Sequence, residues 1–336
     1  MLRLPRFSYL RPGSAAEAAQ LLAEHGSQAR LVAGGTDLLP KMKRGQVEPE
    51  VLVGLGHLGE LRQVRARDDG GFDVGAGVTL SEVGAHPQLR AAYRGYVRAS
   101  ALVSSPALRN AGTIGGNLCV DTRCNYYDMS YEWRQAVGFC MKKDGDICRV
   151  APASATCRAI ASSDTAPVAI ALGASVVLVG PEGEREVSVA SLYQDDGQFY
   201  LTKADDEVLV SLRLPKPDGW RSSYVKVRSR DSIDFPVVGV AAAMKMTGPV
   251  VEACRIVLTA VGPQPLDVSG AAEALLGREL DDAAVEEVAL QAAKPARPLD
   301  NADLGYVWRK RMTRIAIEQA IWEARTTSST TSSRPA

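Results

Sequence analysis

Val32-Ala-Gly-Gly-Thr-Asp-Leu38 indicates how the N-terminal part of the chain folds. It starts at the end of a short apolar segment, residues 29–33, whose composition favours a strand, and a second such segment lies at residues 51–55. Upstream, Ser14-Ala-Ala-Glu17 has the pattern of a capping box and predicts a helix over residues 14–24. This part of the chain therefore folds as a small β-α-β unit with a glycine turn after one strand.

A second glycine turn, Ala111-Gly-Thr-Ile-Gly-Gly-Asn117, has similar chemistry. Glycine lets backbone N–H groups turn toward an anion, and threonine and asparagine add side-chain donors. The first glycine loop (residues 32–38) and the second glycine loop (residues 111–117) are therefore candidates for holding a diphosphate. A tight turn without a ligand is the alternative for each loop. Neither has the G-x-G-x-x-G spacing or the Gly-Lys-Ser ending, which argues against a Rossmann domain and an NTPase.

Size and charge restrict the remaining possibilities. A chain of 336 residues is too long for one core, so two or three subdomains are expected. Its 39 basic and 39 acidic residues cancel, which argues against a nucleic-acid partner. The chain has no run of about 18 apolar residues and no apolar signal region near Met1, so we expect no membrane span and a cytoplasmic location.

Strand and helix patterns continue beyond the second glycine loop. Apolar strand patterns occur at residues 174–179 and 208–214, and a helical pattern occurs at residues 166–172. Pro215-Lys-Pro-Asp-Gly219 reads as a linker, because two prolines and a glycine resist both helix and strand. After it, three strands (residues 223–228, 237–246 and 251–261) and two helices (near residues 268–276 and 306–324) are expected. They indicate a third, α+β unit.

Four of the six cysteines fall close together, at intervals of 16, 8 and 9 positions. They are Cys124, Cys140, Cys148 and Cys157. Thiols stay reduced in the cytoplasm, so such a group indicates metal ligands before disulfides. Thiolates are the soft ligands of iron-sulfur clusters, whereas zinc sites typically use close Cys-x2-4-Cys pairs, which these four do not form. The intervals do not match ferredoxin spacings either, so spacing alone does not decide between cluster and zinc.

Several motifs in one order resemble a known family. They are Phe7-x-Tyr9-x-Arg11-Pro12, Ala33-Gly-Gly-Thr-Asp-Leu38, Gly112-Thr-Ile-Gly-Gly-Asn117, Ser163-Asp164-x-x-Pro167 and Lys226 in a strand. Over residues 1–325 the chain resembles the FAD-binding medium subunit of the molybdenum hydroxylase family, which includes xanthine dehydrogenase and carbon monoxide dehydrogenase. The resemblance implies an α+β protein with a two-subdomain FAD-binding fold of the PCMH/VAO type and a C-terminal α+β domain with a three-stranded sheet.

The resemblance also implies domain boundaries. The N-terminal FAD-binding subdomain would span residues 1–56 and the second one residues 57–217. The C-terminal domain would span residues 218–325, and residues 326–336, a Ser/Thr run, would be a disordered tail. The cysteine insert, at about residues 120–160, is extra length within the second subdomain.

Site residues are implied in the same way. The diphosphate and ribityl chain of FAD would be held by Val32, Ala33, Gly34, Gly35, Thr36, Asp37, Leu38, Thr113, Gly115, Gly116 and Asn117. Asp164 would accept hydrogen bonds from the flavin or its ribityl hydroxyls, with a helix N-cap as the alternative role. Lys226 would lie near the isoalloxazine ring, with a solvent-facing strand lysine as the alternative. No catalytic base is evident.

The cysteine insert resembles one branch of the family, the β subunit of 4-hydroxybenzoyl-CoA reductase. In that branch the loop binds a 4Fe-4S cluster, and the resemblance carries its ligands to Cys124, Cys140, Cys148 and Cys157. It implies reduction of an aromatic acyl-CoA, with electrons from ferredoxin. The partners would be a small 2Fe-2S subunit and a large molybdenum-cofactor subunit, in a heterohexamer of two three-subunit units. The alternatives are the FAD subunit of an NAD-linked or otherwise linked hydroxylase, and a zinc-stapled assembly protein without redox activity.

Overall fold

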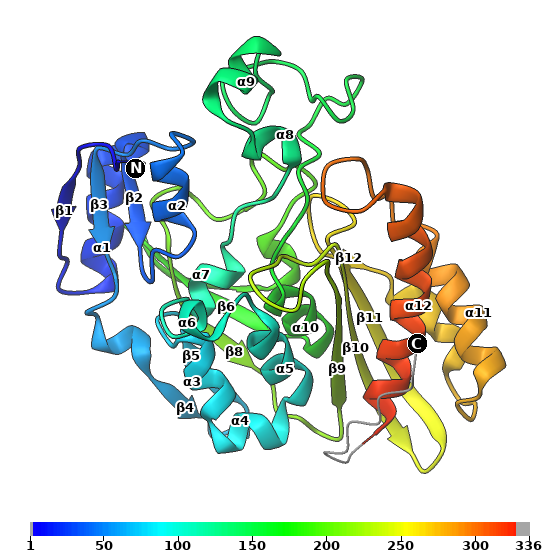
Figure 1. Ribbon diagram of the computed structural model, residues 1–336. Coiled ribbons are helices and arrows are strands. Elements are labelled where there is room, and N and C mark those ends of the chain that lie inside the picture. Colours follow the sequence, from blue (N-terminus) through cyan, green and yellow to red (C-terminus); the bar gives the residue numbers. More distant parts are fainter. Residues whose placement is uncertain (1–2, 327–336) are drawn as a thin grey trace.

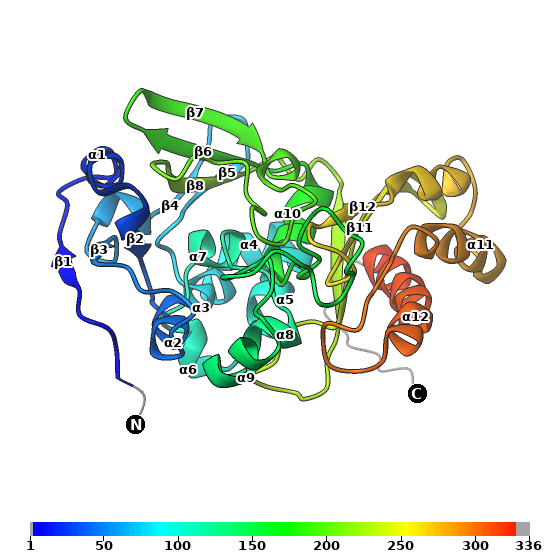
Figure 2. The ribbon, with the colours of Figure 1, turned by 90° about the horizontal axis from the view of Figure 1, so that it is seen from above.

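Three β-sheets follow one another along the chain in the computed structural model, which describes residues 3–326 (Figure 1). The N-terminal sheet lies at the left of Figure 1, the central sheet in the middle and the C-terminal sheet at the right. Seen from above, the same succession is kept, and the β6–β7 hairpin projects from the central part (Figure 2). Within residues 3–326 no helix has the length and apolar character needed to cross a bilayer.

The N-terminal sheet is parallel and has the order β1-β3-β2. Its strands are Ser8–Leu10, Val51–Gly54 and Ala29–Val32, and its helices are α1 (Ala15–His25), the 3-10 helix η1 (Gly26–Gln28) and α2 (Leu38–Lys43). The predicted helix, strands and β-α-β connection are confirmed. Ser14 caps α1 by accepting from the backbone N–H of Glu17, but Glu17 reaches back to Gly13 and not to Ser14. The reciprocal hydrogen bond of a capping box is therefore made to the residue before the N-cap and not to the N-cap itself.

The central sheet has five strands in the order β4-β5-β8-β6-β7, all antiparallel. They span Val64–Ala66, Phe72–Gly75, Val208–Leu214, Ser175–Gly180 and Gly183–Ser188. The helices around it are η2 (Gly59–Arg62), α3 (Leu80–Ala85), α4 (Pro87–Ala92), α5 (Arg94–Leu102), α6 (Pro106–Arg109), α7 (Ile114–Leu118), α10 (Thr165–Leu172) and η3 (Ala190–Leu192). Helix α10 is apolar all round and is buried except at Ile170, because it lies inside the core between the central and C-terminal sheets.

The C-terminal sheet is antiparallel, with the order β12-β11-β10-β9. Its strands span Leu266–Asp267, Val250–Thr259, Val238–Thr247 and Arg221–Val227, and its helices are η4 (Ser269–Leu275), α11 (Asp282–Ala293) and α12 (Tyr306–Arg325). Strand β10 is buried on both faces: Ala241 packs into the central core, and Val240 packs into the core beneath α11 and α12. The C-terminal unit is therefore fixed to the rest of the molecule through a continuous apolar contact.

The fold class predicted from the sequence is confirmed, with three differences in the C-terminal unit. The sheet has four strands rather than three, because the short β12 adds to its edge. The helix expected near residues 268–276 is a 3-10 helix, and α11 was not predicted. The linker at residues 215–219 lies between β8 and β9. The predicted tail lies outside the described residues except for Thr326.

The cysteine insert has little regular structure and stands out from the body at the top of Figure 1. It contains only two short helices, α8 (Asn125–Asp128) and α9 (Tyr131–Ala136). Its ends are joined by two backbone hydrogen bonds of 2.8 Å between Arg123 and Ile160. The insert thus leaves and re-enters the body at one place.

Candidate functional site for a flavin and a metal cluster

The two glycine loops lie against each other. A Cβ atom on Gly34 would overlap the carbonyl group of Ala111, and one on Gly112 would lie 3.6 Å from Thr36 Oγ1. Gly35 has a φ of +69°, a conformation that other residues rarely adopt. Segments about 75 positions apart in the sequence therefore form one cradle, and glycine is required where their backbones meet.

The first glycine loop has unused backbone donors. Among the described residues no acceptor receives a hydrogen bond from the N–H groups of residues 34–37. In the second loop, by contrast, the N–H groups of Ile114 and Gly115 bond to Val78 and Ala76 at 2.9 Å each, and that of Gly116 bonds to Thr113 Oγ1 at 3.1 Å. The first loop therefore has the free donors that a diphosphate needs, whereas the second loop uses most of its donors to hold its own shape.

Asn117 connects the second glycine loop to the segment before α10. Its Oδ1 accepts from Ser163 Oγ at 3.0 Å, from the backbone N–H of Thr165 at 3.2 Å and from Thr165 Oγ1 at 2.7 Å. The side-chain oxygen is fully used within the protein. Asn117 thus fixes the position of residues 163–165 relative to the loop.

Asp164 is buried, and both of its hydrogen-bond partners come from strand β9. Asp164 occupies the N-cap position of α10, but its side chain caps no helix N–H, and Ser163 Oγ accepts from the N–H of Ala166 instead. The carboxylate accepts from Tyr224 Oη at 2.8 Å and from Lys226 Nζ at 2.9 Å. Burial raises the pKa of Asp164, although Lys226 acts in the opposite direction.

Lys226 is also buried, with a side chain only 1% exposed, so the interpretation as a solvent-facing strand residue is wrong. Its ammonium group donates to Asp164, to the carbonyl of Leu102 at 3.0 Å and to the carbonyl of Asp234 at 2.9 Å. Burial lowers the pKa of Lys226, although Asp164 acts in the opposite direction. All three N–H donors of the ammonium group thus bond to acceptors within the protein. A contact between Lys226 and the flavin ring stays a prediction.

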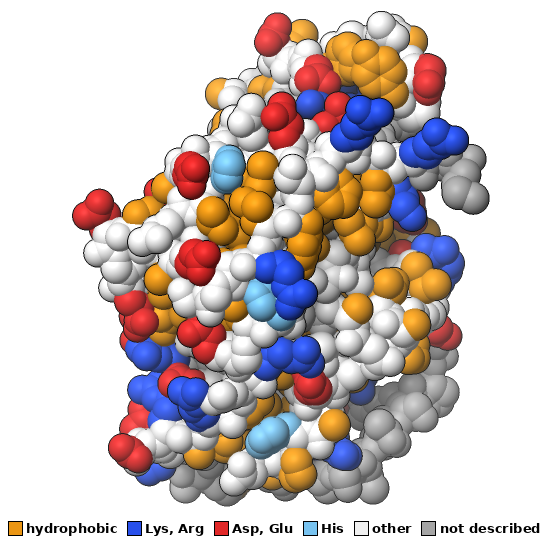
Figure 3. Space-filling model, turned by 90° about the vertical axis from the view of Figure 1, so that its left-hand side faces the viewer, with side chains coloured by type: hydrophobic (Ala, Val, Ile, Leu, Met, Phe, Trp, Pro, Cys, Tyr) orange, Lys and Arg blue, Asp and Glu red, His pale blue; other side chains and the backbone are white. Residues whose placement is uncertain are grey.

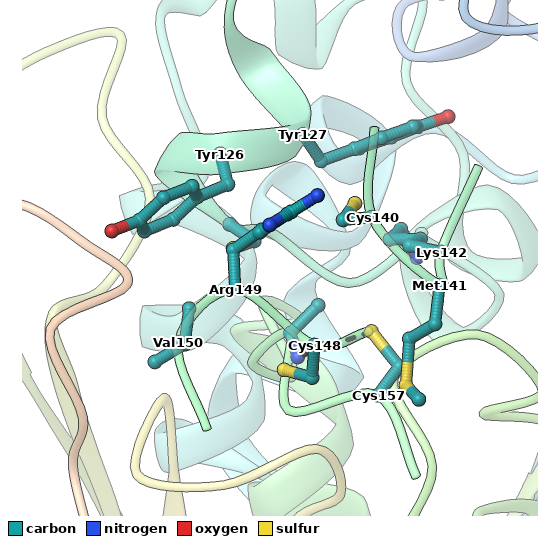
Figure 4. Close-up of a pocket in the computed structure, with 11 residues that line it drawn as sticks. Tyr126, Tyr127, Cys140, Met141, Lys142, Cys148, Arg149, Val150 and Cys157 are labelled. Carbon is teal, nitrogen blue, oxygen red and sulfur yellow. Dashed lines mark hydrogen bonds between the residues drawn. The ribbon is translucent and has the colours of Figure 1, made fainter. Parts of the chain in front are cut away.

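The four clustered cysteines line one buried cavity, here called the cysteine cavity (Figure 4). Its other walls are Tyr126, Tyr127, Met141, Lys142, Arg149, Val150 and Ala159. Figure 4 shows Arg149 extending across it between Tyr126 and Cys140. The lining includes two cations and no carboxylate, which suits an anionic occupant such as a thiolate-bound metal centre.

Burial disfavours the thiolate form of two of the four cysteines, Cys124 and Cys157. It raises the pKa of Cys124 to about 12 and that of Cys157 to about 11. Without a cation the two thiols therefore stay protonated, and binding of a metal centre must release their protons. Within residues 3–326 no three His, Cys, Asp or Glu side chains are arranged to hold a metal ion. The cysteines therefore surround a common space without converging on one point.

Two further cysteines lie elsewhere. Cys119 follows the second glycine loop, and its backbone carbonyl accepts from Tyr200 Oη at 2.8 Å. Cys254 is buried in β11, where burial raises its pKa to about 12. Neither lines the cysteine cavity.

An ion network joins the cysteine insert to the first glycine loop. Arg123 pairs with Asp37, Lys41 of α2 pairs with Asp121, and Lys142 pairs with Asp121 at 2.8 Å. Of these residues, only Asp37 was singled out from the sequence. The available signal was a pair of opposite charges, Asp121 and Arg123, shortly after the second glycine loop. Asp121 is complementary to Lys41, and Arg123 is complementary to Asp37.

The network leaves Asp121 firmly ionised. Burial alone would raise the pKa of this carboxyl, but the ammonium groups of Lys142 and Lys41 lower it to about 2. Lys41 loses more to burial than it gains from Asp121 and Asp37, so its pKa is lowered. Pairing therefore stabilises the charged form of both groups, but for Lys41 the effect of burial is larger.

Two protein families cover nearly the whole chain. Residues 5–217 match the FAD binding domain in molybdopterin dehydrogenase, and residues 223–324 match the CO dehydrogenase flavoprotein C-terminal domain. The carbon monoxide dehydrogenase medium chain of Hydrogenophaga pseudoflava is 30% identical over 323 residues, 94% of this chain and 97% of that one. The aldehyde oxidoreductase FAD-binding subunit of Escherichia coli K12 is 33% identical over 280 residues, 79% of this chain and 84% of that one.

A solved structure agrees with these matches. Carbon monoxide dehydrogenase from Hydrogenophaga pseudoflava, in a form that lacks the Mo-pyranopterin moiety, contains a chain that superposes with a TM-score of 0.79. The sequences are 27% identical, and the superposition covers 97% of this chain and 100% of that one. This chain therefore belongs to the FAD-binding medium subunits of the molybdopterin dehydrogenase family, of the carbon monoxide dehydrogenase and xanthine dehydrogenase type.

Proposed function

We propose that this chain is the electron-transfer subunit, carrying FAD and a 4Fe-4S cluster, of a molybdenum-dependent enzyme resembling 4-hydroxybenzoyl-CoA reductase. The observation that carries the proposal is the meeting of Cys124, Cys140, Cys148 and Cys157 at one buried cavity. The insert that brings them there is tied by ion pairs to the first glycine loop. A flavin and a metal centre in one chain suit transfer of electrons rather than bond making.

The residues of the chain fit both groups. The free N–H donors of residues 34–37 fit the diphosphate of FAD, and Thr113, Gly115, Gly116 and Asn117 shape the facing wall. The four cysteines fit a 4Fe-4S cluster, in which each thiolate binds its own iron and the sulfur atoms need not converge on a point. When bound, FAD exchanges one or two electrons and the cluster exchanges one. Asp164 and Lys226 keep the wall beside the flavin in place.

We further propose the reaction and the partners. The enzyme would remove the phenolic hydroxyl of an aromatic acyl-CoA, with electrons from ferredoxin. They would leave toward a small 2Fe-2S subunit and a large molybdenum subunit, in a heterohexamer. Exposed apolar side chains such as Phe7 and Tyr9 support contact with other chains. Figure 3 shows hydrophobic side chains gathered on the face that lies at the left of Figure 1.

Two other functions are distinguishable. The first alternative is a hydroxylase subunit that binds FAD but no cluster, and the relatives are named as carbon monoxide dehydrogenase and aldehyde oxidoreductase chains. It predicts FAD without iron, and reduction of the isolated subunit by NADH would support an NAD-linked enzyme. A zinc-stapled assembly protein is disfavoured by the lack, among residues 3–326, of three suitable ligands around one point. It predicts colourless protein containing zinc.

The deciding experiment measures iron, zinc, acid-labile sulfide and flavin in anaerobically purified protein. We expect about four irons, four sulfides and one FAD per chain, as a 4Fe-4S cluster and one flavin require. Cys140→Ser should lose iron and keep FAD, while the matched control Cys254→Ser, also a buried cysteine but outside the cavity, should keep both. Zinc in place of iron, or equal iron in the two variants, would refute the cluster assignment.

A further inference from the structure

Lys142 is the most tightly held cation in the wall of the cysteine cavity. Its ammonium group donates to Asp121 Oδ1 at 2.8 Å, to Thr122 Oγ1 at 2.7 Å and to the carbonyl of Gly197 at 2.6 Å. The side chain is only 5% exposed. A lysine on the surface moves freely in water, but this one is fixed by three acceptors at a wall shared with the four thiols.

The acceptors of Lys142 come from two separate parts of the chain. Asp121 and Thr122 open the insert, and Gly197 lies in the segment after η3. Asp121 is itself held by Lys41, which also lies 3.5 Å from Asp37 of the first glycine loop. The ammonium group is therefore positioned by the body of the protein and not by the insert alone.

A buried cation at this place has a defined effect on a one-electron centre. Reduction adds one negative charge to a centre that already carries the charge of four thiolates. A fixed positive charge in a poorly solvated wall stabilises the reduced form more than the oxidised form, and solvent screens it weakly. Protein charge near a cluster is one of the factors that set its potential.

We propose that Lys142 raises the reduction potential of the cluster held by the four cysteines, and that Asp121 and Gly197 fix the ammonium group where it does so. This inference rests on the proposed function. Lys142 binds no metal and acts only through its charge. Arg149, the other cation of the wall, is tied to the carbonyls of Phe139 and Gly138, so Lys142 is the cation that links the cavity to the body of the protein.

The test compares two neighbouring lysines of the intact protein. Lys142→Gln removes the buried charge, and Lys143→Gln removes the same charge from a side chain that is 38% exposed and pairs with Asp144 at 3.3 Å. After iron and sulfide have been measured, the potential is taken from a redox titration followed by electron paramagnetic resonance. Lys142→Gln should lower the equilibrium constant for reduction at least tenfold, which is 59 mV for a one-electron couple. Lys143→Gln should leave it unchanged.

Each outcome has one meaning. Full iron with an unchanged potential in Lys142→Gln overturns this inference and leaves the proposed function intact. Wild-type protein without iron overturns both. If Lys142→Gln loses its iron, Lys142→Arg keeps the charge and Lys142→Met removes it in a side chain of similar length. A reduction potential close to wild type in Lys142→Arg and a lower one in Lys142→Met support the inference. Equal potentials in these two variants overturn it.

Discussion

Lys226 Nζ lies 2.9 Å from Asp164 Oδ2, although 62 positions separate the two residues and almost no solvent reaches either side chain. The pair joins the start of α10 to strand β9, and thereby the central part of the molecule to the C-terminal sheet. Tyr224, two residues before Lys226 in the same strand, holds the other carboxylate oxygen. The junction between the central part of the molecule and the C-terminal sheet is thus stabilised by a buried ion pair as well as by apolar contacts.

The first prediction concerns removal of one partner of this pair. Lys226→Met should lower the free energy of unfolding by about 3–5 kcal/mol, because it leaves a buried carboxylate uncompensated. The double variant Lys226→Met with Asp164→Asn should be more stable than Lys226→Met alone, since Tyr224 can still donate to the amide oxygen. Chemical denaturation of the flavin-free protein measures both.

A matched control for this prediction exists on the surface. Lys245 pairs with Asp218 at 3.2 Å, and its side chain is 34% exposed. Lys245→Met should change the free energy of unfolding by less than about 1 kcal/mol. Equal losses at positions 226 and 245 would contradict the role given to burial.

The second prediction concerns the contact between the two glycine loops. Gly34→Ala puts a methyl group into the carbonyl of Ala111, so the loops must move apart. We expect a loss of about 1–3 kcal/mol in stability and weaker retention of FAD. Gly59→Ala is the control, because nothing lies within 4 Å of a Cβ atom there. Flavin content after gel filtration measures retention, and equal retention in both variants would show that the loop contact does not shape the FAD site.

The third prediction is a pH dependence. The pKa of Asp121 falls from 3.8 to about 2 on folding, so its contribution is present above pH 4 and is lost as the pH falls toward 2. Asp121→Asn should therefore lower the free energy of unfolding by about 2 kcal/mol at pH 7 and by about half of that at pH 3. Denaturation of both proteins at the two pH values measures this. A difference that does not vary with pH would show that the ion network adds nothing.

The fourth prediction concerns the contact between α12 and the insert. Arg309 is fully buried and donates to the carbonyls of Val237 at 3.0 Å and Leu299 at 2.9 Å, and to that of Ala260. Asn301, beside it, bonds to the insert through Asn125 and Arg158. Arg309→Met removes the guanidinium donor from these carbonyls, of which that of Leu299 keeps only the backbone N–H of Asn301, so hydrogen exchange in residues 123–160 should become faster. Exchange unchanged from that of the exposed control Arg311→Met would contradict the link.

Local patterns were sufficient to predict the longer strands of the C-terminal sheet, several of the others and the first helix. The strand over residues 208–214 was predicted at its observed bounds, because its apolar composition and the following prolines define it without help from the rest of the fold. The helix beginning after Ser14 was predicted because capping depends on neighbours within three residues. Helix α11 was missed, since its many alanines give only a weak apolar stripe.

Local sequence patterns could not predict the contacts between distant segments. Asp164 has the residue type of an N-cap, but Tyr224 and Lys226 come from a strand 60 positions away and take its carboxylate. The same pairing buries Lys226, which local sequence would place in solvent. The cysteines were singled out by their clustering, whereas the ions that anchor the insert, Asp121 and Lys142 among them, needed the fold to be recognised.

The closed ends of the cysteine insert have a consequence for how such a subunit can arise and be rebuilt. Arg123 and Ile160 are held together by paired backbone hydrogen bonds, so a short turn could join them, at the cost of the contacts that Gly197 and Asn301 make with the insert. The insert contains all four clustered cysteines, so they would be gained or lost together. Its removal leaves two ends that already lie side by side. A flavoprotein scaffold could gain or lose these four cysteines through one insertion or deletion, without redesign of its apolar core.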